Sequence, residues 1–331
     1  MRRALLIVLS LLVAFAATGI WVAHRSGNQP PIDVVAKAEA DHRVDLESSM
    51  ISVNGIRLHV VQAGPLEGPP VILLHGYPEF WWGWHNQIPE LAKAGFRVIA
   101  PDQRGFNASD KPPGVEAYKL DERVLDIVSL IESLGYESVY VAGHDMGAVV
   151  AWYLAIEHPD KVRKLVAISV GHPLAYEAAS KEKSEQETIS WYRTFFQIPV
   201  IPELVGRLNN WGLLVDNIRK TSREGTFSDD EMNVYRYAWD RDDAMHSMIN
   251  WYRAGYRYPS PVEGAGRVRM PTKIIWGKHE AFSEARVAQL SLEFCDSGAV
   301  VVLPDAGHWL LHEEPMTSSR LIIDFFEQSG S

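Results

Sequence analysis

Three short segments contain side chains that could act together as a nucleophile, an acid and a base. Gly143-His-Asp-Met-Gly147 places Asp145 between small residues, which is the pattern of a nucleophile elbow with a carboxylate in place of the usual hydroxyl. Asp305-Ala-Gly-His308 ends in a histidine, which can serve as a general base near neutral pH. Trp276-Gly-Lys-His-Glu280 ends in a glutamate that could orient this histidine. Along the chain the nucleophile comes first, then the acid and then the base.

Each of these residues also has a structural interpretation. Asp145 could cap the helix that follows it, as aspartate often does. His308 is one of 12 histidines, and a lone histidine is more often structural than catalytic. Glu280 could be an exposed surface residue. The catalytic interpretation is favoured because all three segments follow predicted strands.

The elements that would position these residues are strands and helices in alternation. Because the alternation is regular, it predicts an α/β fold with a mostly parallel central sheet flanked by helices. Asn54-Gly55 predicts a hairpin at the start of the sheet. Ligands of such sheets bind at the carboxyl ends of the strands, so the three segments should meet at one edge. The short apolar runs that predict buried strands are residues 71–74, 96–100, 139–142, 164–169, 273–276 and 300–303.

The alternation stops between residues 172 and 264, where no strand-like run occurs and aromatic residues recur at helical spacing. We therefore predict an α/β-hydrolase core from residues 50–171 and 265–331, with an inserted helical lid over residues 172–264. Residues 26–49 are largely polar, so we predict a linker there.

The amino-terminal residues predict a membrane segment. Arg2-Arg3 precedes an apolar run from Ala4 to Ala23, about the length that a helix needs to cross a bilayer. The two arginines favour a cytoplasmic amino terminus, which would place the catalytic domain outside the cytoplasm with residues 1–25 as its membrane anchor. The alternative is a signal peptide, cleaved near Ala14-Phe-Ala16, and export of the rest.

Composition excludes several classes of protein. The 331 residues are 47% hydrophobic and carry a formal net charge of −10, so neither long disorder nor a nucleic-acid partner is expected. A single cysteine, Cys295, rules out an internal disulfide framework and a thiolate zinc cluster.

Residues from about Met50 to Gln328 resemble an epoxide hydrolase of the α/β-hydrolase fold. The resemblance implies that Asp145 forms an ester with the substrate, which water activated by His308 and Glu280 then hydrolyses. It also implies an oxyanion hole made by the backbone N–H groups of Tyr77 and Met146. The motifs that carry the resemblance are His75-Gly-Tyr-Pro-Glu79, Asp102-Gln-Arg-Gly105, Gly143-His-Asp-Met-Gly147 and Gly307-His308.

The family also uses two lid tyrosines to hold the epoxide oxygen. Asn250-Trp-Tyr-Arg253 resembles the segment of the second, which implies Tyr252. Tyr192, followed by Phe195-Phe196-Gln197, resembles the first. Either tyrosine could instead simply pack among the aromatic residues of the lid. The other residues expected to line the substrate pocket are Pro78, Trp191, Phe195, Trp251 and Trp309.

The sequence departs from the family pattern at two positions. Glu280 occupies the position of the acid, where the family usually has the shorter aspartate. Asn107 stands where a glycine usually follows the Asp-x-Arg-Gly segment, and asparagine tolerates a positive φ better than most residues.

The resemblance implies conversion of an apolar epoxide and water to a vicinal diol, with no metal or organic cofactor. One alternative is a haloalkane dehalogenase, which uses the same nucleophile. In that enzyme a tryptophan typically follows the nucleophile, whereas this chain has Met146. A protein that binds a hydrophobic ligand without converting it is the other alternative. A serine esterase is excluded because no Gly-x-Ser-x-Gly segment occurs.

Overall fold

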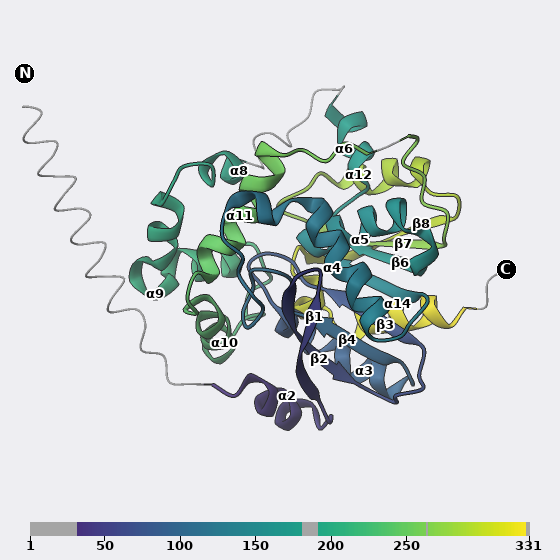
Figure 1. Ribbon diagram of the computed structural model, residues 1–331, viewed down its shortest axis with the longest axis horizontal. Coiled ribbons are helices and arrows are strands. Elements are labelled where there is room, and N and C mark those ends of the chain that lie inside the picture. The colour runs from purple at the N-terminus through teal and green to yellow at the C-terminus, as the bar shows by residue number, and fades with distance from the viewer. Residues whose placement is uncertain (1–31, 181–190, 263, 329–331) are drawn as a thin grey trace, which may run out of the picture.

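A computed structural model describes residues 32–180, 191–262 and 264–328 of the chain (Figure 1). The predicted membrane anchor or signal peptide, residues 1–25, lies outside these residues and stays a prediction. Within the described ranges, no helix is both long enough and apolar enough to cross a membrane.

The described residues form one eight-stranded sheet in the order β1-β2-β4-β3-β5-β6-β7-β8. The predicted turn at Asn54-Gly55 joins β1 to β2, and β2 also pairs antiparallel with β4. All other neighbouring strands are parallel, which confirms the predicted α/β fold class. The strands are β1 (Glu47–Val53), β2 (Ile56–Ala63), β3 (Pro70–Leu74), β4 (Arg97–Pro101), β5 (Val139–His144), β6 (Val162–Ile168), β7 (Thr272–His279) and β8 (Gly298–Gly307).

Helices flank the sheet. The helices α4 and α5 pack against each other, and α3 packs against α14. Tyr140 of β5 stacks on Phe326 of α14 at 4.8 Å between ring centroids, which ties this second pair of helices to the sheet. The flanking helices are α3 (Gln87–Lys93), α4 (Leu120–Ser133), α5 (Met146–Glu157), α12 (Ala285–Leu290), α13 (Leu310–Glu313) and α14 (Pro315–Glu327).

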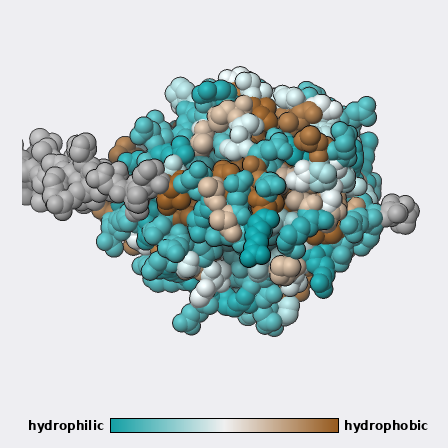
Figure 2. Space-filling model, turned by 90° about the horizontal axis from the view of Figure 1, so that it is seen from below, coloured by the Kyte–Doolittle hydropathy of each residue, from teal (hydrophilic) through white to brown (hydrophobic). Residues whose placement is uncertain are grey.

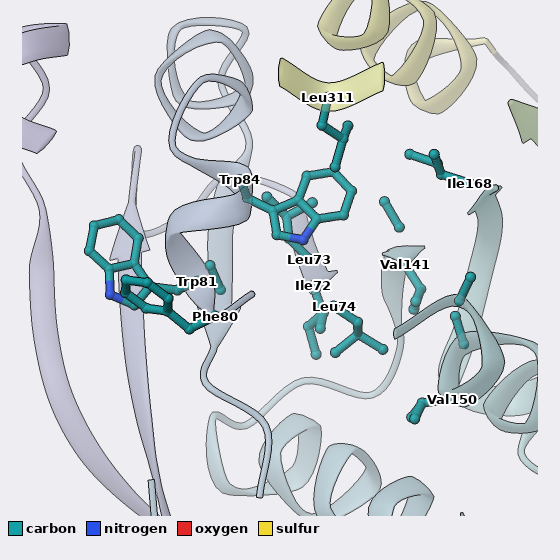
Figure 3. Close-up of a cluster of buried hydrophobic side chains, with 14 of the residues drawn as sticks. Ile72, Leu73, Leu74, Phe80, Trp81, Trp84, Val141, Val150, Ile168 and Leu311 are labelled. Atoms are coloured by element: carbon teal, nitrogen blue, oxygen red, sulfur yellow. The ribbon is translucent and has the colours of Figure 1, made fainter. Parts of the chain in front are cut away.

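The centre of the core lies on the parallel strands. Every residue of β3 and β4 is buried, as the apolar runs at these positions predict. Figure 3 shows Leu311 of α13 beside the ring of Trp84, from the 3₁₀ turn η1 (Trp81–Trp84), in the same cluster as Leu73 of β3. The same view shows Val141 of β5 and Val150 of α5 within this cluster. The residues that follow the central strands are therefore held by a rigid base.

The insertion between β6 and β7 is helical, as predicted, and four of its helices, α8 to α11, gather on one side of the sheet in Figure 1. Its longest helix, α9, is interrupted at residues 208–211, where the backbone leaves the helical conformation. The exact limits of the predicted lid, residues 172–264, stay a prediction. The helices described are α6 (Pro173–Ser180), α8 (Trp191–Phe195), α9 (Ile201–Lys220), α10 (Asp229–Trp239) and α11 (Ala244–Arg257).

The predicted linker, residues 26–49, is wrong in part. The helix α2 (Val34–His42) forms within it, capped by Asp33, and β1 already begins at Glu47. Val34 and Ala38 are buried and lie four residues apart, so they share one face of the helix. Two apolar positions in a polar stretch are too weak a signal to predict such a helix without the surface it packs on.

One outer face of the molecule is largely hydrophilic, with hydrophobic residues in scattered patches (Figure 2).

Candidate active site

The turn between β5 and α5 presents Asp145 at the edge of the sheet. The residue has φ 49° and ψ −123°, a backbone conformation that is strained for any residue with a side chain. A Cβ at Gly147 would overlap the carbonyl oxygens of Leu74 and His75, so only glycine lets α5 approach β3 this closely. A Cβ at Gly76 would collide with Asp145 in the same way. The spacing of the glycines in the sequence therefore corresponds to a real strand-turn-helix elbow.

The structure brings the three predicted side chains together. His308 directly follows β8, and its Nε2 atom lies 3.7 Å from Oδ2 of Asp145. Glu280 directly follows β7, and its two carboxylate oxygens lie 2.8 and 3.0 Å from Nδ1 of His308. The distance of 3.7 Å is too long for a direct hydrogen bond, which leaves Nε2 free to engage another group.

Glu280 controls the protonation of His308. Burial alone would lower the pKa of this histidine, but the charge and the hydrogen bond of Glu280, with the charge of Asp145, outweigh it and raise the pKa to about 9. The Glu280 side chain is only 2% exposed, so the interpretation of Glu280 as an exposed surface residue is wrong. The extra methylene relative to aspartate does not prevent contact with the imidazole.

One of the two predicted oxyanion-hole N–H groups contacts the carboxylate directly. The N–H of Tyr77 donates to Oδ1 of Asp145 at 2.8 Å. Met146 is the first residue of α5, and the N–H groups of a first helical turn have no partner within the helix. The Tyr77 N–H is therefore placed where charge on an oxygen bonded to the Asp145 carboxyl carbon could be stabilised, and the same role for the Met146 N–H stays a prediction.

The two predicted lid tyrosines lie together above Asp145. Tyr192 of α8 and Tyr252 of α11 meet edge to face, with their ring centroids 5.7 Å apart. Burial, reinforced by the charge of Asp145, raises the pKa of both phenols above the usual value near 10. Both phenols therefore keep their protons at neutral pH and can act as hydrogen-bond donors.

Two cavities meet at these residues. We call the first, of about 440 Å³, the apolar arm; of the predicted pocket residues, it is lined by Pro78, Trp191, Phe195 and Trp309. We call the second, of about 400 Å³, the α4 arm; it is lined by Trp251 and by residues of α4 and α5. The residues that both arms share are Asp145, Tyr192, Tyr252, Phe282 and His308. An extended molecule could thus place its reacting atoms at the centre and a substituent in each arm.

Sequence reasoning assigned no role to a buried network behind His308. Glu79 accepts a hydrogen bond from the Tyr235 hydroxyl at 2.7 Å and lies 2.8 Å from Nε2 of His312 and 3.1 Å from Nδ1 of His144. Nε2 of His144 contacts the carbonyl oxygen of His308 at 2.9 Å, so the network supports the loop that carries the histidine. Burial would raise the pKa of Glu79, but its two histidine partners lower it well below the usual value. Glu79 belongs to a recognised motif, whereas its partners come from distant segments that no local pattern connects.

Metal ligation has no support in the described part of the chain. It contains no group of three or more His, Cys, Asp or Glu side chains that could hold a metal ion.

The elbow, and the acid and histidine that follow later strands, form the arrangement found in α/β hydrolases. The alpha/beta hydrolase fold family matches residues 69–315. The chain belongs to this family. Among relatives of this α/β hydrolase, the AB hydrolase superfamily protein YfhM of Bacillus subtilis (strain 168) is 39% identical over 282 residues, which cover 85% of this chain and 98% of that protein.

Other relatives of this α/β hydrolase are named epoxide hydrolases. Epoxide hydrolase 2 of Caenorhabditis elegans is 33% identical over 285 residues, covering 85% of this chain and 80% of the relative. A mutant of an epoxide hydrolase from Bacillus megaterium, solved with its product (R)-3-[1]naphthyloxy-propane-1,2-diol, superposes with a TM-score of 0.76 and 30% identity. That match covers 85% of this chain and 100% of the other.

Proposed function

We propose that this α/β hydrolase is an epoxide hydrolase that converts an epoxide with at least one apolar substituent to a vicinal diol. The observation that carries the proposal is the carboxylate of Asp145 at the elbow, facing two protonated tyrosines across one cavity. The relatives named epoxide hydrolases support it, and the bound diol of the Bacillus megaterium structure is the kind of product expected.

The first step is attack on a saturated carbon. An epoxide carbon has no π bond, so a nucleophile must displace the ring oxygen from behind. A carboxylate oxygen of Asp145 can do this without first losing a proton, whereas a serine would need an adjacent base. The carbon–oxygen bond of the ring breaks as the ester bond forms. The ring oxygen then takes a proton from Tyr192 or Tyr252, both of which line the shared cavity and keep their protons at neutral pH.

The second step is hydrolysis of the ester. Esterification removes the charge of Asp145, one of the charges that raise the pKa of His308, so the imidazole becomes a better match for a base near neutral pH. His308 takes a proton from water, which attacks the carboxyl carbon of the ester. The N–H groups of Tyr77 and Met146 stabilise the oxyanion, and one such donor is worth about 3–4 kcal/mol in other enzymes. As the tetrahedral intermediate collapses, the protonated imidazole of His308 donates to the leaving alkoxide, which releases the diol. The new carboxyl group of Asp145 gives its proton to the phenolate, which restores the carboxylate and the phenol.

The replacement His308→Gln tests this scheme, because the ester should form but not hydrolyse. With naphthyl glycidyl ether as the probe, we expect the intact mass of the protein to rise by the full mass of the epoxide. A chloroalkane that reacted as in a dehalogenase would instead add its mass less hydrogen chloride. A protein that only binds would gain no covalent mass.

The double variant Asp145→Asn, His308→Gln is the matched control and should gain no mass with either compound. An adduct in this control would mean that another residue is the nucleophile. If the single variant gains no mass from any epoxide while remaining folded, the proposed function is wrong.

A further inference from the structure

The α4 arm of the cavity contains a buried arginine that has no carboxylate partner among the described residues. Arg123 of α4 lines this arm and is only 3% exposed. The one hydrogen bond of its side chain among the described residues is a long one, 3.4 Å from Nε to the carbonyl oxygen of Lys119. Its Nη1 atom is buried with no hydrogen-bond partner in that part of the chain.

The other buried arginines of the described residues are all paired. Arg97 binds Glu47 through two nitrogens at 2.8 and 2.9 Å, and Arg253 binds Glu203 at 2.6 Å. Arg104 forms a bidentate pair with Asp126, with both bonds at 2.5 Å. A buried guanidinium without such a partner is costly, so its position in a cavity calls for a partner that comes from outside the chain.

Neighbouring side chains hold Arg123 in place without neutralising it. Its guanidinium lies 4.3 Å from the ring centre of Trp251, close enough for a cation–π contact. The Asp121 side chain accepts a hydrogen bond from the Ser260 hydroxyl at 3.0 Å, and its charge acts on Arg123 without an ion-pair contact among the described residues. Burial, and then the charge of Arg104, lower the pKa of Arg123 to about 9, so the group remains a cation at neutral pH.

The two arms differ in what they offer a substrate. The residues of α9 that line the apolar arm include Leu213, Leu214 and Ile218. The α4 arm has Arg123 inside, and it is also lined by the exposed Arg193 of α8. A guanidinium presents parallel N–H donors that match the two oxygens of a carboxylate.

We propose that Arg123 is a substrate-binding residue that takes a carboxylate. The preferred epoxide would carry an apolar substituent in the apolar arm and, on the other carbon, a chain that ends in a carboxylate in the α4 arm. This inference rests on the proposed function and narrows its substrate class from apolar to amphiphilic epoxides.

The test compares epoxides that carry a terminal carboxylate with their methyl esters, in a series that differs in the number of methylenes between ring and carboxylate. We expect the wild-type enzyme to prefer one of the acids over its ester in kcat/KM. Replacing Arg123 by Met should lower kcat/KM for that acid by roughly 10- to 100-fold, the effect of one hydrogen bond between charged groups, and leave the ester within about twofold.

Arg193→Gln, which removes the exposed cation of the same arm, is the matched control and should retain most of the preference. Arg123→Lys keeps the positive charge but lacks the parallel N–H donors of a guanidinium, so it should retain part of the preference for the acid. It takes the place of Arg123→Met in the test if that variant does not fold. An acid-to-ester ratio that is the same in wild type and in the Arg123 variants would overturn the inference.

Calorimetry with the corresponding saturated acid and ester separates this inference from the proposed function. If the wild type binds the acid more tightly than the ester, and Arg123→Met abolishes the difference, the carboxylate site stands even if no epoxide is hydrolysed. If epoxides are hydrolysed but neither turnover nor binding distinguishes the acid from the ester, the assignment of a carboxylate site to Arg123 is wrong and the proposed function remains.

Discussion

His308 holds its proton more tightly than an exposed histidine does. The cause is local, since a buried carboxylate, Glu280, faces one nitrogen of its ring and Asp145 lies near the other. The raised pKa of His308 affects both steps of the proposed reaction. The charged pair Asp145 and His308 suits a resting enzyme in which the nucleophile is ionised. The base is needed only after esterification has removed the charge of Asp145.

Replacing Glu280 by Gln should reduce the stability of the protein in a pH-dependent way. The folded-state pKa of His308, about 9, is raised above the ordinary 6.5, so its contribution is complete below 6.5 and is lost as the pH rises through 9. A rise of this size corresponds to roughly 3 kcal/mol at most. Urea unfolding of both proteins should therefore show a larger difference in free energy below pH 6.5 than above 9. A difference that does not change over this range would contradict the coupling.

At the scale of elements, the elbow depends on the close approach of β3 and α5. The strain in Asp145 persists because the surrounding strands and helix overdetermine its backbone conformation. Gly143 and Gly147, on either side of Asp145, are required for space rather than for flexibility. A side chain at either position would overlap a neighbouring carbonyl group.

Replacing Gly147 by Ala should lower the free energy of unfolding by about 1–3 kcal/mol or more, because the new methyl group must push β3 away from α5. It should also lower epoxide turnover, since the displaced elbow carries Asp145. Gly255→Ala is the control, because Gly255 lies in helix α11 with no atom near its missing Cβ. That variant should gain up to about 1 kcal/mol from helix propensity. If thermal unfolding showed equal losses of stability in the two variants, steric overlap at the elbow would not be the cause of the loss in Gly147→Ala.

At the scale of the whole molecule, the inserted helices are fastened to the core by polar atoms of large aromatic side chains. The indole N–H of Trp239 donates to the carbonyl oxygen of Pro78 at 2.7 Å, and that of Trp251 to the carbonyl oxygen of Arg104 at 3.0 Å. Tyr235 reaches Glu79 in the same manner. Each bond crosses from the insertion to a loop that follows a core strand, so the two parts are not independent units.

We expect the insertion and the core to unfold in one cooperative transition. Near-ultraviolet and far-ultraviolet circular dichroism should give the same midpoint. Trp239→Phe should lower the free energy of unfolding by about 1–3 kcal/mol, because it leaves the buried carbonyl of Pro78 without its donor. Two separate transitions in the wild type, with the earlier one removing part of the helical signal in the far ultraviolet, would show that the insertion folds independently.

The sheet could be predicted because its strands are short apolar runs that report burial on both faces, and such burial is a local property of composition. The helix α2 could not, because Val34 and Ala38 become significant only once a surface exists for them to cover. Asn107 illustrates a detail that local chemistry did predict, since it adopts φ 37° where the family usually has glycine. The assignment of Trp251 to one undivided pocket missed that the cavity has two arms.

By itself, the sequence determined the fold class, the elbow and the three residues that follow strands, because turn chemistry and strand ends are encoded within a few neighbouring positions. Only the tertiary structure decided which of the described histidines meet a carboxylate, and that Arg123 faces a cavity with no carboxylate partner among the described residues. Distances between side chains from different strands depend on how the whole sheet twists and packs, and no local pattern contains them.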